Sequence, residues 1–145
     1  MAVTIDDIKA LNFGYLTGED LLQFCSPQLL IKQYTVDSNS LQNGFNFAQS
    51  EVIASFTTRY DLSGELVKTS TNRALLLVKI MSLLSIRNAL GSFQELSEKM
   101  KDDFSWADYT VKSIRNGQMN LPLPIANIAK VSTANLIDSN YLTLG

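Results

Sequence analysis

The chain has no histidine and a single cysteine, Cys25, among its 145 residues. These two absences exclude zinc sites built from Cys and His, Ser-His-Asp and Cys-His nucleophile systems, and general-base catalysis by imidazole. A lone cysteine also excludes an intramolecular disulfide, so the sequence gives no sign of an oxidising compartment. Because its neighbours are apolar, Cys25 is expected to pack as a small hydrophobic side chain.

Glycine motifs that cradle phosphates are missing too, because Gly64 and Gly91 are isolated glycines. Neighbouring carboxylates occur at Asp6-Asp7 and at Asp102-Asp103. Adjacent residues on a helix diverge by about 100°, so neither pair converges on a substrate. We therefore expect no catalytic residues, no cofactor and no metal site, and a protein that is not an enzyme.

Long hydrophobic runs and targeting signals are also lacking. The longest apolar stretch, around Leu75 to Ile86, is interrupted by Lys79 and two serines and is too short to span a membrane. The start, from Met1 to Asp7, lacks the basic and apolar regions of a signal peptide. The sequence thus predicts a soluble protein made in a cytoplasm, with no membrane partner.

Charge is scarce, at 18% of the residues against about 25% in a typical soluble domain. Because a free-standing monomer usually carries more surface charge, part of this surface is expected to be covered by partners. The net charge of −2 gives no general attraction for nucleic acid.

What the sequence does contain is helical periodicity, which predicts an all-α fold: a small bundle of about four to five helices with an extended C-terminal arm. We expect the bundle over residues 1–117, with Gly117 ending the last helix as its C′ glycine, and the arm over residues 118–145. Capping patterns at Thr4, Thr17 and Ser26 begin the short first helices. The longer helices are expected over about 41–60, 71–90 and 94–116.

The helices at 71–90 and 94–116 differ in character. The first is apolar nearly all round, so it is either the central helix of the bundle or shared with a neighbouring subunit. The second is amphipathic, with Trp106 and Tyr109 off its apolar stripe. Whether these two aromatics contact their own domain or anchor another subunit remains open. Intrahelical ion pairing is favoured over DNA binding for the basic residues of this helix, which are Lys99, Lys101, Lys112 and Arg115.

The arm begins with Leu121-Pro122-Leu123-Pro124, which cannot continue a helix and must run extended. Its remainder carries only Lys130 and Asp138 as charges and many aliphatic residues, so it must lie on another surface, either its own bundle or a partner. We favour a partner. The expected partner-binding residues are Leu121, Pro122, Leu123, Pro124, Ile125, Ile128, Val131, Leu136, Ile137, Tyr141 and Leu142.

Three stretches in order carry a resemblance: Ala48–Ile53 leading into Arg59-Tyr60, the apolar helix Leu75–Leu90, and Val111–Pro122 with its glycine and Leu-Pro segment. Ile5–Ile8 ahead of Phe13-Gly14 adds a fourth. Together they resemble the head–tail connector (head-completion, or adaptor) proteins of tailed phages.

The resemblance implies a structural virion protein at the head–tail junction, made in the host bacterial cytoplasm. Its protomers would form a ring, typically twelve-fold, that joins the portal protein to the tail or to further connector proteins. Packaged DNA would pass through without specific binding. Arg59 and Tyr60 would act as a local structural latch.

A second function remains open, a small DNA-binding or regulatory protein with a helix-turn-helix at Ser26-Pro27. It is disfavoured because Gln28 and Leu29 stand at the start of the second helix and Lys32 is its lone cation.

Overall fold

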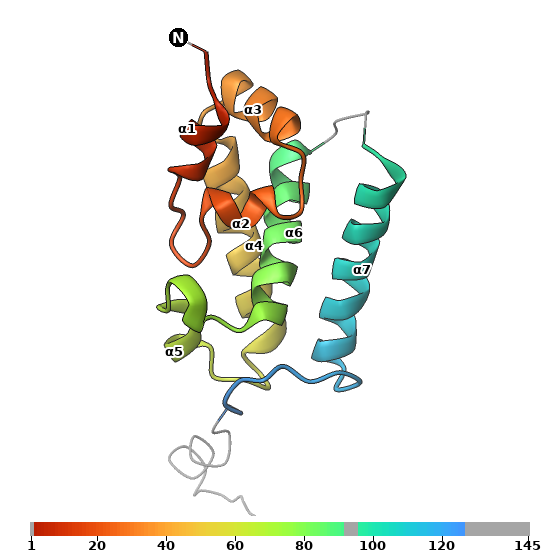
Figure 1. Ribbon diagram of the computed structural model, residues 1–145. Helices are drawn as coiled ribbons and strands as arrows, with labels where there is room; N and C mark the ends of the chain where they lie inside the picture. The colour runs from red at the N-terminus through yellow and green to blue at the C-terminus, as the bar shows by residue number, and fades with distance from the viewer. Residues whose placement is uncertain (1, 92–95, 127–145) are drawn as a thin grey trace, which may run out of the picture.

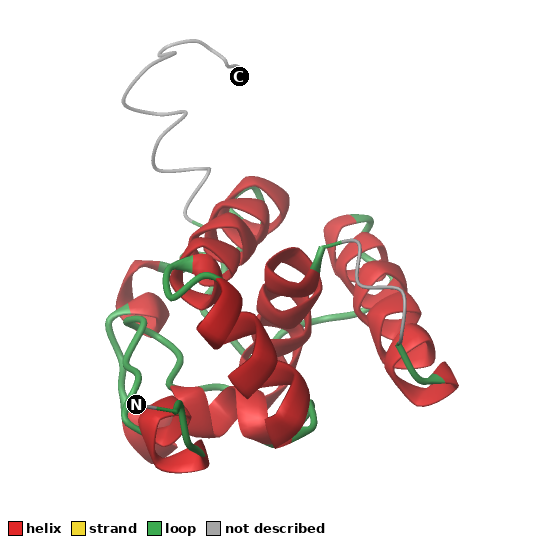
Figure 2. Cartoon of the chain, turned by 90° about the horizontal axis from the view of Figure 1, so that it is seen from above, coloured by secondary structure: helices red, strands yellow, loops and turns green. Residues whose placement is uncertain are grey.

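Figure 1 shows a computed structural model of the chain, which describes residues 2–91 and 96–126. Over these ranges the chain is a bundle of α-helices with no β-strand, as Figure 2 shows from above, so the predicted all-α class is confirmed. The elements are α1 (Ile5–Lys9), α2 (Gly18–Leu22), α3 (Pro27–Val36), α4 (Ser40–Phe56), α5 (Ser63–Leu66), a 3₁₀ turn (Ser70–Asn72), α6 (Leu75–Leu90) and α7 (Glu98–Arg115). Four helices are long, namely α3, α4, α6 and α7, and each of the other helical elements is about one turn long.

The predicted caps begin the first helices. The Thr4 N–H donates to Asp7 Oδ2 at 2.8 Å, and the Thr17 N–H donates to Asp20 Oδ2 at the same distance. Ser26 Oγ accepts the Leu29 N–H at 3.4 Å, with proline at the first helical position. These contacts satisfy amide groups that have no partner within the helix.

Three helix boundaries differ from the expectation, one of them the start of α7, which lies at Glu98 rather than near residue 94. The helix α4 ends at Phe56 rather than near residue 60, because the chain must turn there towards α5. The turn leads into α5, and Asp61 Oδ1 accepts the Ser63 N–H at the start of that helix at 3.0 Å. Likewise, α6 begins at Leu75 rather than near residue 71, after the separate 3₁₀ turn.

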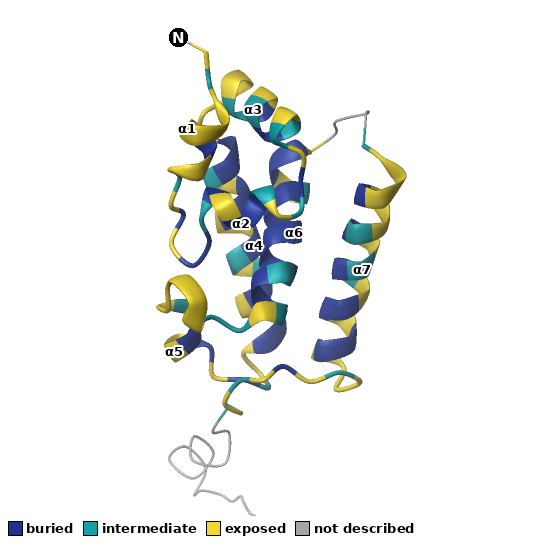
Figure 3. Ribbon diagram, viewed as in Figure 1, coloured by how far each residue is buried: buried dark blue, intermediate teal, exposed yellow. Residues whose placement is uncertain are grey.

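The helix α6 is the central one, and Figure 3 shows it buried over most of its length. The two serines that interrupt its apolar sequence, Ser82 and Ser85, are themselves fully buried. Ser85 Oγ meets its hydrogen-bonding need by donating to the Met81 carbonyl at 2.7 Å. Since α4, α2 and α7 all pack against α6, the apolar helix needs no neighbouring subunit to cover it.

Gly44 brings α4 unusually close to α6. A Cβ at this position would lie 2.5 Å from the Ser85 carbonyl oxygen and 3.0 Å from the Ala89 amide nitrogen. The glycine that weakens the first turn of α4 thus allows the largest helix–helix contact of the bundle.

Replacing Gly44 by alanine should therefore destabilise the fold. Overpacking against backbone costs about 1–3 kcal/mol, which exceeds the roughly 1 kcal/mol that alanine gains in helix propensity. Urea unfolding followed by fluorescence of Trp106, the single tryptophan, measures the change. Gly64→Ala is the matched control, because a Cβ there meets nothing within 4 Å. Equal midpoints for the two variants would contradict the close crossing.

Candidate partner-binding surface

The described part of the arm, residues 118–126 and here named the strap, crosses one end of the bundle (Figure 1). The helix α7 ends at Arg115, and Gly117 two residues later has a left-handed φ of +83°, as expected of a C′ glycine. The Gln118 and Met119 N–H groups then donate to the Ser113 carbonyl at 2.8 and 3.1 Å. These bonds turn the chain sharply away from the helix axis.

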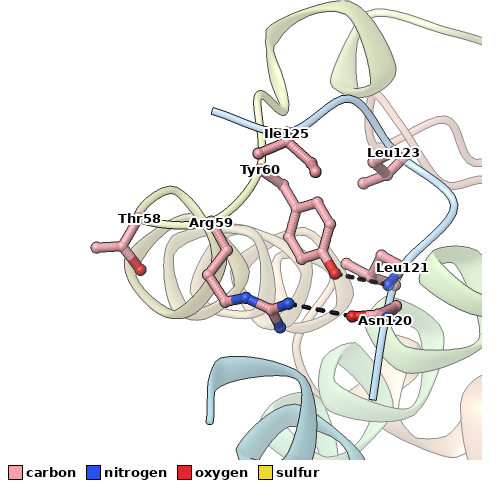
Figure 4. Close-up of a pocket in the computed structure, with 7 residues that line it drawn as sticks. All are labelled: Thr58, Arg59, Tyr60, Asn120, Leu121, Leu123 and Ile125. Atoms are coloured by element: carbon pink, nitrogen blue, oxygen red, sulfur yellow. Dashed lines mark hydrogen bonds between the residues drawn. The ribbon is translucent and has the colours of Figure 1, made fainter. Parts of the chain in front are cut away.

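Arg59 and Tyr60 hold the strap with their side chains (Figure 4). The Arg59 guanidinium donates to the Ile114 carbonyl at the end of α7 and to Asn120 Oδ1, the latter at 3.1 Å. The Tyr60 hydroxyl accepts the buried Leu121 N–H at 2.9 Å. One arginine thus ties the end of α7 to the strap, and the neighbouring tyrosine satisfies an amide that water cannot reach.

Backbone pairing adds a second attachment. The Asp61 N–H donates to the Pro124 carbonyl at 2.8 Å, and the Ala126 N–H donates to the Arg59 carbonyl at 2.9 Å. They form an antiparallel bridge between Tyr60 and Ile125. Because successive residues of an extended chain point to opposite sides, Ile125 is held on the outside.

The strap and the 58–60 segment enclose a hollow of about 460 Å³ (Figure 4). Ile125 stands at its rim with 79% of its surface exposed, and Leu123 is half-buried beside it. An exposed aliphatic residue that backbone hydrogen bonds already order is a favourable contact for a partner, because little conformational entropy is lost on binding.

The expected partner-binding residues divide into three groups. Leu121 is a correction: only 5% of its surface is exposed, because it packs into the core of its own chain. Pro122, Pro124 and Ile125 are exposed on the strap, and Leu123 is half-buried there. The others, Ile128, Val131, Leu136, Ile137, Tyr141 and Leu142, lie outside the described residues.

Trp106 and Tyr109 lie away from the strap. The Lys79 ammonium of α6 sits 4.2 Å from the centre of the Trp106 ring, so this half-buried aromatic has a contact within its own domain. Tyr109 is 65% exposed and remains available to another molecule. The structure does not bring either residue together with Arg59 and Tyr60.

The basic residues of α7 are partly paired with acids. Lys99 Nζ lies 2.8 Å from Asp103 Oδ2, and Lys101 Nζ lies 4.0 Å from Glu98 Oε1. Arg87 of α6 contacts Asp108, which joins α6 to α7. The two pairs within α7 are of the intrahelical kind that the sequence predicts, whereas the Arg87–Asp108 contact joins two helices.

Sequence reasoning missed a buried polar cluster beside α2, which is formed by Tyr15, Asp20, Glu65 and Arg73. The Arg73 guanidinium donates to both carboxylate oxygens of Asp20, at 2.6 and 2.9 Å. The Tyr15 hydroxyl donates to Glu65 Oε2 at 2.5 Å, and that oxygen also accepts the Ala74 N–H at 2.6 Å. The cluster ties the loop before α2 to the start of α6. No spacing rule links residues so far apart in the sequence.

Burial and hydrogen bonding act against each other in this cluster. Burial raises the pKa of Asp20, but hydrogen bonds from Arg73 and from the Thr17 backbone outweigh it and hold the pKa below its usual value. Burial also raises the pKa of Glu65, but the hydrogen bonds that Tyr15 and the Ala74 N–H donate to it outweigh this effect and lower its pKa. Burial and the bond to Glu65 raise the pKa of Tyr15. Burial raises the pKa of the Cys25 thiol to about 11, which keeps it protonated and unreactive.

The proposed helix-turn-helix pair corresponds to α2 and α3. Lys32 is the basic residue of α3, and its exposed companions Gln28 and Thr35 are neutral. A recognition helix needs several cations to contact phosphates, so this pair has little charge for duplex binding.

Within residues 2–91 and 96–126, no group of three or more His, Cys, Asp or Glu side chains is arranged to hold a metal ion. In the same part of the chain, no helix is both long and apolar enough to cross a membrane. Comparisons with protein-family models, curated proteins and solved structures find no match.

The strap bond from Leu121 can be tested by Tyr60→Phe. Removing the hydroxyl leaves a buried N–H without its acceptor and should lower the free energy of unfolding by about 1–3 kcal/mol. Tyr109→Phe is the control, since that side chain is mostly exposed and should change stability by less than about 0.5 kcal/mol. Chemical denaturation of both variants measures the change in the free energy of unfolding. An unfolding midpoint that Tyr60→Phe leaves unchanged would contradict the hydrogen bond.

Acid should destabilise the fold through Asp20 and Glu65. Both folded pKa values lie below the usual 3.8 and 4.5, so the carboxylates contribute full stability above these values. That contribution is lost as the pH falls through the folded pKa values, because protonation breaks the bonds to Arg73 and Tyr15. Melting temperatures measured across the acidic range should show the decline. In Glu65→Gln the decline should be shallower, and an unaltered slope would show that this carboxylate is not responsible.

Proposed function

We propose that this chain is a structural protein of a tailed-phage particle, one protomer of a head-to-tail connector ring that joins the portal to the tail. The proposal starts from the resemblance carried by Arg59-Tyr60, by the apolar helix α6 and by the Gly117 to Pro122 segment. A small all-α bundle with an extended segment across one end supports it.

The observation that carries the proposal is the way Arg59 and Tyr60 order the strap. Their side chains and backbone hold residues 119–126 by hydrogen bonds, while Ile125 stays 79% exposed. An aliphatic side chain that hydrogen bonds already hold in place loses little conformational entropy when a partner covers it, which suits a protein that works by docking.

The work of such a protomer is mechanical. Its ring would extend the portal channel, and its strap end would meet the portal or the next protein towards the tail. Packaged DNA would pass through the ring without specific binding, which suits a net charge of −2. No feature of α3 favours the DNA-binding alternative.

Mixing the purified chain with portal rings of the same phage tests the proposal. Size-exclusion chromatography with light scattering should show the chain co-eluting with the portal, and negative-stain microscopy should show an added ring. Ile125→Asp should weaken this association by about tenfold or more, because burying an isoleucine contributes about 1.5–3 kcal/mol.

Val36→Asp is the matched control. Val36 is 72% exposed, but it ends α3, at the far end of the bundle from the strap (Figure 1). This variant should bind the portal as the unaltered chain does. A chain that ignores the portal but shifts duplex DNA in gels would overturn the proposal, and so would equal losses in the two variants.

A further inference from the structure

The outer face of α4 carries no charged side chain. Spacings of three and four residues place its exposed residues on one stripe of the helix. Phe47, near the middle of the helix, is 67% exposed, and Ile53 is 38% exposed. The residues of this outer face are Asn43, Asn46, Phe47, Ser50, Ile53 and Ala54.

A face of this composition is typical of a contact surface rather than of a solvated helix. The outward side of α7 shows the usual solvated pattern, with exposed Glu98, Lys101 and Asp102. In α4 the one charged residue is Glu51, and it lies beside the stripe and pairs with Arg87 at 3.2 Å. Depletion of charge together with an exposed aromatic residue marks the centre of protein interfaces.

The strap ends beside the C-terminal end of this outer face. Ala126, the last described residue of the strap, shares a hollow of about 400 Å³ with Ile53 and Thr57 at the end of α4. Its N–H is bonded to the Arg59 carbonyl at 2.9 Å, so its position is set by the bundle. The described part of the chain therefore ends beside Ile53.

The residues that follow match the outer face in chemistry and length. Residues 127–145 hold Lys130 and Asp138 as their only charges, which cancel, and many aliphatic side chains. The 17 residues of α4 span about 25 Å at 1.5 Å per residue. Roughly eight extended residues cover that distance at about 3.3 Å each, so the tail is long enough to run the length of the helix.

We propose that residues 127–145 lie along the outer face of α4 of their own chain, entering at Ile53 and covering Phe47. The strap favours the same chain over a second copy, because a tethered segment meets its site at a high effective concentration. The proposal does not depend on the connector role: it concerns the isolated chain, whatever partner the strap later meets.

A spin label on α4 tests this in the full-length chain. Ser50→Cys places the label on the outer face, in a Cys25→Ser background, and Ser105→Cys places it on the exposed side of α7 as a control. The label at position 50 should broaden the amide resonances of the tail, and the label at position 105 should not. Full intensity of the tail resonances with the label at 50 would overturn the proposal.

The same label identifies the chain to which the tail binds. Mixing labelled, isotopically silent protein with unlabelled, ¹⁵N-enriched protein leaves only contacts between molecules visible. The proposal expects no broadening in this mixture. Broadening that appears in the mixture and is absent from the dilute single-chain sample would assign the tail to a second copy, which contradicts the proposal.

Proteolysis gives an independent measurement, because Lys130 is a trypsin site within the tail. Phe47→Asp should speed cleavage after Lys130 by about tenfold, as expected when roughly 1.4 kcal/mol of tail contact is lost. Val36→Asp, at a similarly exposed valine on α3, should leave the rate unchanged. Mass spectrometry of the released peptide gives both rates, and equal rates in the two variants would refute the contact with Phe47.

Discussion

The apolar helix α6 must be covered on nearly every side, and this requirement determines where the other elements lie. Its residues from Leu77 to Ile86 are almost entirely buried, including serines that a surface helix would expose. One flank is closed by α4, which comes close enough only because Gly44 lacks a side chain. The amphipathic helix α7 and the short α2 close the others. Burial of this helix supplies the main driving force of the fold.

Two arginines organise the segments that are not helical. Arg73 holds the loop before α2 through the Tyr15 carbonyl and α2 itself through Asp20, and Arg59 joins the strap to the end of α7. Both use the planar, many-donor guanidinium to satisfy carbonyls or carboxylates from distant parts of the chain. The bundle is therefore closed by hydrogen bonds at places where hydrophobic packing alone would leave the backbone unpaired.

Sequence periodicity predicts the long helices and the caps of the first ones, because both follow from local spacing, and it limits α6 to a central or a shared position. It could not predict that Leu121 is buried in its own domain. The sequence of an extended arm is the same whether a given apolar residue faces a partner or the core of its own chain. Nor could it find Glu65, whose partners Tyr15 and Ala74 lie in other segments. At the strap, the sequence singled out Arg59 and Tyr60 through a resemblance, but not the carbonyls that they bind. Long-range hydrogen bonds have no sequence period, so they appear only in three dimensions.

The strap also bears on the order in which the chain folds. The bond from Leu121 to Tyr60 joins residues 61 positions apart, and Arg59 needs the finished end of α7 for its own bond. Docking of α7 on α6 must therefore precede closure of the strap, and Tyr60 is expected to form its native contact after the transition state. Interactions formed that late act on the unfolding rate alone. A stronger latch would make the protein slower to open without making it faster to fold.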